Sequence, residues 1–526
     1  MKNVITFSLR QRQEVRRVQQ IARFIKIMIL LMTTFGVIQS SLAGDDERSK
    51  KPEFYYKPYS EAEIKAVLQR PLSMEDCIRI ALAKNIGLRM ASRDLARTEA
   101  LHAGSYGRFL PVLSLEGTRI NSLLEVASRD SISRLIESSF ENNSNLTGKA
   151  SLFLPTGATF QYSQDLLREV LFPIDDPKEI SRNRSYSFNF TQPLLRGAGP
   201  RMARSNFLLT GYDQQIEENS LYNRKLQTVV LVKRVYFNLL LQRELVKINT
   251  SAFKRDSILV LASNALIQAK LATRRDALSA EIRVADDRAA LLAGQSDYES
   301  ALDNLKDVLG LPIEATIGVD STGLDYVKVD LNEQEIVMHV LEQNPSVRSS
   351  EVALARTRLA YSVTKNTQLP QLDLVASYAS TLQRDLVVNQ DQRRTGGWQA
   401  SLNLNYPLFS REAASRAEEA EIFVAQQEDR VQELKRQITI NIRDIVRAVN
   451  NKVEQIVAIK RGIEVAEVKL DFATTMFNLG RASNFDITES QEFLLKAQNQ
   501  YLRILVEYHT KLAILESLTG KPLVTQ

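Results

Sequence analysis

Residues 72–115 (LSMEDCIRIALAKNIGLRMASRDLARTEALHAGSYGRFLPVLSL) align without a gap with residues 331–374 (LNEQEIVMHVLEQNPSVRSSEVALARTRLAYSVTKNTQLPQLDL), at an offset of 259. Twelve of the 44 aligned pairs are identical, and both stretches end in a Leu-Pro pair followed by alternating leucines. Similarity at a fixed spacing over such a length indicates that the chain contains two copies of one structural unit.

The rest of each copy also matches, at an offset near 210. Three pairs of segments correspond: Phe190–Leu195 with Leu404–Phe409, Ala272–Asp276 with Ala482–Asp486, and Leu309–Pro312 with Thr519–Pro522. The change of offset gives the first copy about 50 extra residues, between about 116 and 185. The predicted domains are a signal peptide at 1–43, a lead-in at 44–71, repeat 1 at 72–312, a linker at 313–330 and repeat 2 at 331–522.

Each copy begins with a predicted helix, because apolar residues such as Ile78, Leu82 and Leu95 recur at helical spacing. The helix must end before the Leu-Pro pair, since proline disfavours helix in the residue before it. The period then changes to two, which predicts strands over about 109–194 and 370–407. Tyr186, Phe188 and Phe190, for example, alternate with Ser187, Asn189 and Thr191.

A soluble sheet with one buried face shows the same alternation. The small uncharged polar residues on the second face, with aromatic residues near the strand ends, favour a membrane barrel instead. The extra segment of repeat 1 contains two more possible strands, Ala150–Leu154 and Ala158–Ser163. They could add a hairpin to the barrel, giving six strands per chain, or they could form an external loop or a rim.

Two long helical hairpins follow the strands, at about 200–310 and 410–520. In repeat 2 an apolar residue recurs every seventh position from Ile442 to Phe477, and repeat 1 does the same from Val232 to Ile267. This period of 3.5 is typical of a coiled-coil seam. A helix from about 203 to 267 would be about 100 Å long. Both stretches are interrupted once, at 269–273 and 479–483, so each hairpin has one tip, far from the strands.

The first 43 residues read as an export signal. Basic residues up to Lys26 precede an apolar run from Ile27 to Ile38, and Ser41-Leu42-Ala43 offers small residues at a cleavage site. The run of about 12 residues is shorter than a membrane-spanning helix. This segment holds seven basic residues and one acidic residue, leaving 68 − 7 = 61 and 62 − 1 = 61 in the remainder. The mature chain is therefore neutral, and its charge gives no support to a nucleic-acid partner.

The sequence offers no enzyme chemistry, no metal site and no cofactor site. One cysteine, Cys77, and three scattered histidines exclude a disulfide framework and the usual zinc spacings. Phosphate-binding, metalloprotease and hydrolase motifs are missing. Gly197-Ala198-Gly199 lies between a strand and a helix, but it lacks the third glycine of a dinucleotide loop and is read as a turn. Cys77 is predicted to pack on the apolar face of the first helix.

In the order of these motifs, repeated twice, the chain resembles the TolC family of outer-membrane channel proteins. The likeness covers Leu72 to Pro522 and includes Asn85 with Asn344, the Gln192-Pro193-Leu194 and Tyr406-Pro407-Leu408 strand exits, and Gly480-x-Ala482-Ser483-x-x-Asp486. The resemblance implies a mainly α fold with a membrane β part: a homotrimeric outer-membrane β-barrel continued by a helical tunnel in the periplasm. It also implies a periplasmic adaptor and an inner-membrane pump as partners, and contact with outer-membrane lipid.

The resemblance implies functional sites at the hairpin tips. Asp486 and Glu489, with Asp276 at the equivalent place in repeat 1, match acidic positions that ring the periplasmic entrance. The adaptor contact would involve Leu479, Gly480, Arg481, Lys270 and Leu271. A plainer interpretation also fits, because acids in the first turn of a helix stabilise it through the helix dipole, and a tight turn is often polar.

Two other classes of protein remain open. A periplasmic coiled-coil adaptor would have one hairpin and a small β-domain, without a duplication of the whole length. A soluble coiled-coil scaffold would leave the signal and the strands unexplained. Among export routes, the sequence does not separate small-molecule efflux from protein secretion.

Overall fold

A computed structural model describes Phe54 and residues 56–130, 133–173, 179–268, 274–320, 324, 326, 328–385, 392–408, 411–479 and 481–520. The chain divides into two compact units, Met1–Tyr55 and Tyr56–Gln526, and the account below concerns the second. The signal-peptide prediction lies outside the described residues. Among the described helices, none combines the length and the apolar character that spanning a membrane would require.

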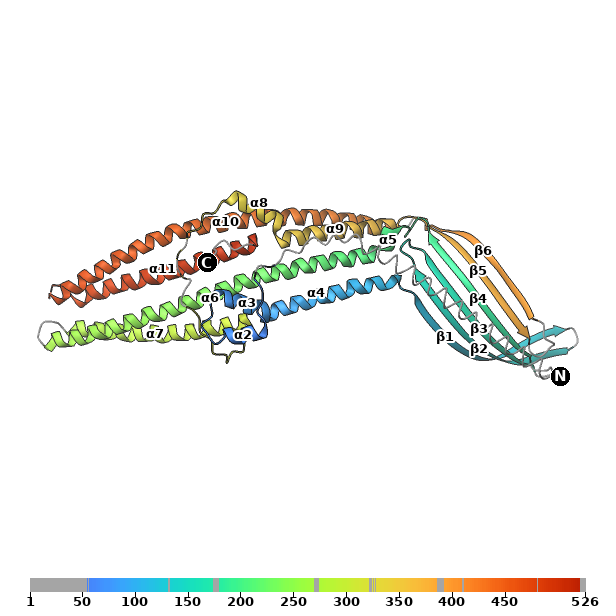
Figure 1. Cartoon of the computed structure of the whole chain (residues 1–526), viewed down its shortest axis with the longest axis horizontal. Coiled ribbons are helices and arrows are strands. Elements are labelled where there is room, and N and C mark those ends of the chain that lie inside the picture. Colours follow the sequence, from blue (N-terminus) through green and yellow to red (C-terminus); the bar gives the residue numbers. More distant parts are fainter. Residues whose placement is uncertain are drawn as a thin grey trace. The chain divides into compact units, whose positions relative to one another are not determined.

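The order of elements follows the predicted repeat, with helices, strands and a long helical hairpin occurring twice (Figure 1). The lead-in contains α2 (Glu61–Val67). Repeat 1 contains α3 (Met74–Lys84), α4 (Ile86–Ser105), the 3₁₀ turn η1 (Tyr106–Phe109), β1 (Val112–Asp130), β2 (Ser133–Phe153), β3 (Thr159–Pro173), β4 (Glu179–Pro193), α5 (Pro200–Ala203), α6 (Ser205–Gln268) and α7 (Arg274–Leu309). Repeat 2 contains α8 (Glu333–Gln343), α9 (Pro345–Asn366), β5 (Gln371–Asp385), β6 (Gln392–Asn405), α10 (Arg411–Asn478) and α11 (Asn484–Thr519).

The opening helix of each repeat is broken in two, where the sequence predicted one helix. The breaks fall at the paired residues Asn85 and Asn344, whose backbones leave the helical region at ψ 128° and 125°. The side chain of Asn85 accepts a hydrogen bond from the amide of Leu88, and that of Asn344 from the amide of Ser346. Asparagine is a strong N-cap residue, so each one ends one helix and starts the next. Apolar periodicity continues across both breaks and hid them.

All six strands form one antiparallel sheet in the order β1-β2-β3-β4-β5-β6. The extra segment of repeat 1 therefore belongs to the sheet, as β2, β3 and the far parts of β1 and β4. The turn between β2 and β3 is closed by a hydrogen bond from the amide of Leu154 to the carbonyl of Ala158, and Gly157 takes a φ of +92° there. Its missing side chain matters, because a Cβ would lie 2.9 Å from the carbonyl oxygen of Gly197.

Each repeat has its own apolar core between its short helices and its hairpin. In repeat 1, α3 packs against α6 and α7 through buried residues such as Ile78, Leu239 and Leu305. In repeat 2, α8 packs against α10 and α11 through Val340, Ile442 and Tyr508, among others. Cys77 is fully buried, as predicted, and burial raises the pKa of its thiol to about 12. The predicted seam is confirmed where Ile442, Val449 and Ile456 are buried.

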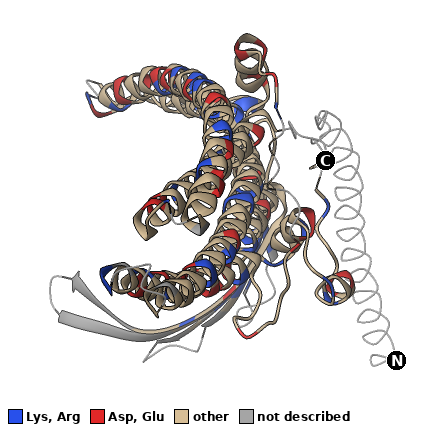
Figure 2. Ribbon diagram, turned by 90° about the vertical axis from the view of Figure 1, so that its left-hand side faces the viewer, with Lys and Arg blue, Asp and Glu red and all other residues tan. Residues whose placement is uncertain are grey.

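The two hairpins also contact each other, because α11 packs against α6. Seen from the hairpin ends, the long helices follow a curved layer with charged residues distributed along it (Figure 2). Both hairpins end on the side opposite to the strands (Figure 1). At 64 and 68 residues, α6 and α10 are about 100 Å long. Side chains at the hairpin ends are thus far from the sheet.

Candidate functional site

The end of the repeat 2 hairpin is organised by the start of α11. Ser483 and Asp486 form a capping box, in which the backbone amide of Ser483 donates to Asp486 Oδ2 at 2.8 Å and its hydroxyl donates at 2.9 Å. These bonds, with a smaller effect of Lys469, lower the pKa of Asp486. Asp486 is exposed and carries a negative charge at neutral pH. The helix-stabilising interpretation of this residue therefore holds, whether or not it also faces a pore.

Glu489 lies one turn further along α11 and forms an ion pair with α10. Its Oε2 is 2.7 Å from Nζ of Lys469, and both side chains are about half exposed. The same ammonium group lies 4.3 Å from the ring centroid of Phe493. Lys469 thus acts on both predicted acids, since its charge also lowers the pKa of Asp486. Asp486 and Glu489 are brought together, with one cation beside them.

The predicted contact residues are only partly described. Leu479 and Arg481 follow α10 and are exposed, as are Phe472 of α10 and Phe485 of α11. Gly480, Lys270 and Leu271 lie outside the described residues. Asp276 is the third residue of α7, and the structure describes its backbone only. Its relation to Asp486 and Glu489 therefore stays a prediction.

Sequence reasoning missed a charged cluster between the hairpins. Asp256 of α6 is only 4% exposed, and Nε of Arg283 on α7 lies 3.7 Å from its Oδ2. Arg283 Nη1 also lies 3.4 Å from Oε2 of Glu492 on α11. The carboxyl group of Asp287, also on α7, acts on Asp256 as well. A signal was present in the sequence, because Asp256 interrupts the buried spacing of Ala252, Leu259 and Ser263. A polar residue in a coiled-coil seam often fixes the register of the helices.

Burial is the main cause that raises the pKa of Asp256, to about 7. Asp287 raises it further, whereas Arg283 and Arg255 oppose this rise. Two carboxyl groups in one buried place do not both ionise readily. Asp256 therefore gains or loses a proton near neutral pH.

Stability should fall as the pH rises from about 4 to about 7. In the unfolded chain Asp256 loses its proton near pH 3.8, but in the folded chain only near 7, so the folded chain binds the extra proton within this window. The lost free energy of unfolding is expected to be on the order of 4 kcal/mol. Thermal unfolding followed by circular dichroism across this range measures it.

Asp256→Asn should flatten this dependence, because the amide does not titrate. Asp286→Asn is the matched control on α7, since Asp286 is exposed. If the Asp256→Asn variant keeps the slope of the parent protein, Asp256 is not the group responsible.

A second buried pair joins the hairpins nearer to the middle of α6. Lys233 of α6 forms an ion pair with Glu516 of α11, and the two side chains are 9% and 8% exposed. Nearby, burial and then the charge of Glu516 raise the pKa of Tyr56 to about 12. A buried pair of this kind links two repeats that are distant in sequence.

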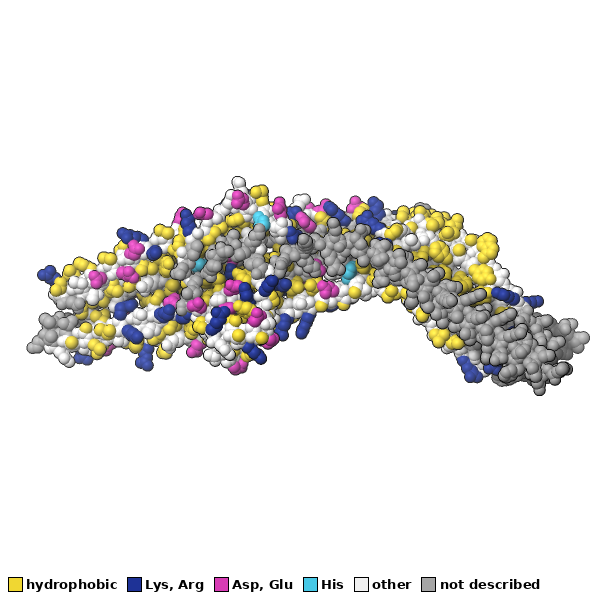
Figure 3. All heavy atoms as spheres, viewed as in Figure 1, with side chains coloured by type: hydrophobic (Ala, Val, Ile, Leu, Met, Phe, Trp, Pro, Cys, Tyr) yellow, Lys and Arg dark blue, Asp and Glu magenta, His cyan; other side chains and the backbone are white. Residues whose placement is uncertain are grey.

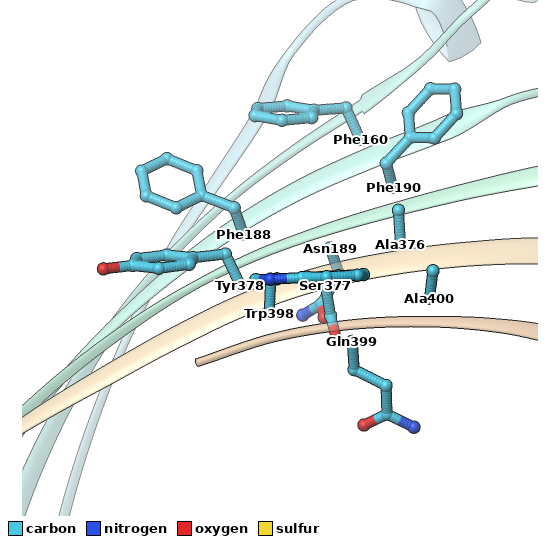
Figure 4. A pocket seen from close by; sticks show the side chains of 10 residues that line it. All are labelled: Phe160, Phe188, Asn189, Phe190, Ala376, Ser377, Tyr378, Trp398, Gln399 and Ala400. Atoms are coloured by element: carbon cyan, nitrogen blue, oxygen red, sulfur yellow. The ribbon is translucent and has the colours of Figure 1, made fainter. Parts of the chain in front are cut away.

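The sheet has one apolar and one polar face. The strand register places Leu113, Tyr162, Phe188, Tyr378 and Trp398 in one row on the same face. Phe160, Phe188, Phe190 and Tyr378 project from one side of the strands, whereas Gln399 points to the other (Figure 4). Hydrophobic side chains gather over the strands in Figure 3. Aromatic and leucine side chains on this face are exposed, although a protein that is surrounded by water normally buries such groups.

The second face carries hydroxyl, amide and carboxylate groups that bond to one another. Thr147 Oγ1 donates to Asp165 Oδ1 at 2.6 Å, and Ser185 Oγ donates to Asp165 Oδ2 at 3.4 Å. The hydroxyls of Ser163 and Ser187 are 2.8 Å apart. Such a face suits water, and its opposite suits hydrocarbon, which is the alternation of a barrel with a wet interior.

Comparisons with known proteins agree with a sheet that has one apolar and one polar face. Residues 337–521 match the family model described as outer membrane efflux protein. The outer-membrane channel OprN is 15% identical over 86% of this chain and 90% of its own, with a TM-score of 0.63. CusC is 15% identical over 90% of this chain and 96% of its own, with a TM-score of 0.62. VceC from Vibrio cholerae is 14% identical over 86% of this chain and 97% of its own, with a TM-score of 0.62. No curated protein matches the chain in sequence.

At such low identities the structural matches establish the fold, and they extend over both repeats. The sequence match is independent of them and covers most of repeat 2. Both confirm the resemblance found in the repeated motifs. Residues 337–521 match the outer membrane efflux protein family, and the chain shares the fold of the outer-membrane channels OprN and CusC.

Proposed function

We propose that the chain is the outer-membrane exit duct of a tripartite export system and has no enzymatic activity. The observation that carries this proposal is the open six-stranded sheet, apolar on one face and polar on the other, joined to two helical hairpins about 100 Å long. The sheet would lie in the outer membrane and the hairpins would extend into the periplasm. An adaptor or scaffold without a pore would have no use for an exposed apolar sheet.

The sheet requires partners of its own kind. Strands β1 and β6 are its two edges within the described residues, and unpaired edge amides cannot persist in hydrocarbon. Because each chain supplies an even number of strands, β6 of one copy would run antiparallel to β1 of the next. Three copies of six strands would close a barrel of eighteen, wider than the twelve that four strands per chain would give. We infer a homotrimer with such a barrel.

The hairpins support the same assembly. Ile258 and Leu261 of α6 and Ile282 of α7 are each at least 65% exposed in the single chain. Three neighbouring copies in a tube would cover such residues, and the covered apolar surface would stabilise the assembly. The tube would enclose a path that is continuous with the barrel.

The hairpin ends would meet a periplasmic adaptor, which in turn holds an inner-membrane pump. Leu479, Arg481 and Phe485 offer an exposed apolar and basic surface for this contact. Gly480, Lys270 and Leu271 complete the proposed contact set. Asp486, Glu489 and Asp276 would form the acidic ring at the periplasmic entrance, where carboxylates favour cations over anions.

Electron images of the detergent-extracted protein, with conductance measured in planar bilayers, test the proposal. We expect three-fold tubes well over 100 Å long that conduct ions, with a barrel of eighteen strands at higher resolution. A compact monomer without conductance would exclude the duct. A conducting trimer with twelve strands would leave the duct intact and contradict the closure through β2 and β3.

Replacing Asp486 and Glu489 by Asn and Gln should lower the preference of the channel for cations. The variant removes six carboxylates from a trimer but leaves Ser483 to cap α11, at a cost of about 1 kcal/mol at most. Reversal potentials under a salt gradient measure the preference. Glu507→Gln is the control, because Glu507 also pairs with a lysine of α10, Lys452, but lies 18 residues further along α11. An unchanged reversal potential in the double variant would remove the ring.

A further inference from the structure

Two rows of side chains on the apolar face of the sheet are rich in arginine. The first row is made of residues that pair with one another across all six strands. It consists of Gly117, Leu146, Leu166, Arg184, Leu382 and Arg394. The next row on the same face consists of Arg119, Ser144, Arg168, Arg182, Arg384 and Gln392. Both rows lie beyond the aromatic row of Trp398, on the side away from the helices.

The height of these rows matches the edge of an apolar band. On β6 the exposed apolar residues run from Leu404, near the helices, to Trp398. Arg394 lies four residues further from the helices along the same strand. Ten residues from Leu404 to Arg394 span about 33 Å along a strand. At a barrel tilt of about 40° this is about 25 Å along the membrane normal, the usual height of the apolar band of an outer-membrane barrel. In the proposed orientation the arginines would therefore lie at the headgroups of the outer leaflet.

Among the described side chains, none balances the positive charge of the rows. All six arginines are exposed, neither row contains an acidic residue, and no described acidic side chain forms an ion pair with any of the six. Arg394 donates a hydrogen bond to the hydroxyl of Tyr186 at 3.0 Å. The acids at nearby heights, Glu116 and Asp165, lie on the opposite face.

Like charges are also placed directly opposite each other. Arg168 pairs with Arg182, and Arg182 pairs with Arg384, across three neighbouring strands. Such pairs destabilise a sheet unless something compensates them. An external anion that lies over β3, β4 and β5 would do so. Every basic residue of the two rows is arginine, whose planar fork binds phosphate through two hydrogen bonds, as lysine does not.

We propose that the two arginine rows bind the phosphorylated sugar headgroup of lipopolysaccharide, while the apolar and aromatic rows below them contact its acyl chains. This inference rests on the proposed function, because it requires that the sheet face outer-membrane lipid. The site is on the outer surface of the barrel and is separate from the export path. It would fix the height of the barrel in the outer leaflet.

The test compares two double variants that remove the same charge from opposite faces. Arg182→Gln with Arg384→Gln acts on the proposed site. Arg393→Gln with Lys149→Gln acts on the polar face, and both of its residues are exposed. Purified trimers are titrated with diphosphorylated lipid A, with its dephosphorylated form and with phosphatidylglycerol in detergent, and bound lipid is measured by native mass spectrometry.

We expect the first variant to lose binding of diphosphorylated lipid A by about tenfold or more, and the second to bind it like the parent protein. Dephosphorylated lipid A and phosphatidylglycerol should bind weakly to all three. Equal loss in both variants, or equal binding of the other two lipids, would overturn the assignment. If the first variant fails to assemble, Arg182→Lys with Arg384→Lys keeps the charge without the fork and should bind lipid A less tightly than the parent.

Conductance separates this inference from the proposed function. Parent trimers that conduct but show no phosphate-dependent lipid binding would contradict the arginine site alone. A parent chain that forms no conducting trimer would contradict the duct itself.

Discussion

Lys233→Met should destabilise the helical part of the protein by about 3–5 kcal/mol. Methionine fills much of the space of the lysine, but it leaves the carboxylate of Glu516 buried at 8% exposure without its cation. The penalty of removing the cation from this buried charge then exceeds anything that is lost in packing. The contact between α6 and α11 should open first, because both partners lie there. Urea unfolding monitored by circular dichroism measures the effect.

The double variant Lys233→Met with Glu516→Leu separates charge from packing. Replacing both members of a buried pair by apolar residues is often neutral or stabilising, so most of the lost stability should return. A double variant as unstable as the single one would show that shape at this position matters more than charge.

The duplication in the sequence predicted the order of the elements, because each copy carries the same apolar periods and the same prolines. It did not predict the breaks at Asn85 and Asn344. A local hydrogen bond to the amide of Leu88 or Ser346 decides each one, and the apolar period does not register it. The number of strands also stayed open, since residues 150–163 alternate equally well in a sheet and in a projecting hairpin.

The charged contacts between the hairpins could not be predicted from the sequence, for a different reason. Lys233 and Glu516 are separated by 283 positions, and their pairing depends on the register between α6 and α11. No local period fixes that register. Asp256 did leave a trace, as a carboxylate in a buried heptad position, but only the structure supplies Arg283 and Glu492 around it. The arginine rows likewise require the register of all six strands.

Gly310→Ala should cost about 2–5 kcal/mol, the second large effect that we expect. Gly310 ends α7 with a φ of +68°, a conformation that costs an L-residue about 1–2 kcal/mol. A Cβ there would also lie 2.5 Å from the carbonyl oxygen of Lys84, so the junction of α3 and α4 would have to move. Forced backbone shifts of this kind cost about 1–3 kcal/mol more.

The internal repeat supplies a matched control for this prediction. Gly520 ends α11 at the equivalent position with a φ of +67°, but no described heavy atom lies within 4 Å of where its Cβ would be. Gly520→Ala should therefore cost only the conformational part, about 1–2 kcal/mol.

The difference between the two alanine variants isolates the contact of Gly310 with Lys84. That contact connects the end of the repeat 1 hairpin to the helices that lead into β1, where the side chain of Asn85 also donates to the carbonyl of Val308 at 2.8 Å. Hydrogen exchange should accordingly increase in α3 and at the start of α4 in the Gly310→Ala variant, and at the end of α11 in the Gly520→Ala variant. Equal losses of stability in both variants would mean that Gly310 is required only because of its positive φ. A larger loss for Gly310→Ala means that the hairpin is held in register with the strands by close backbone packing.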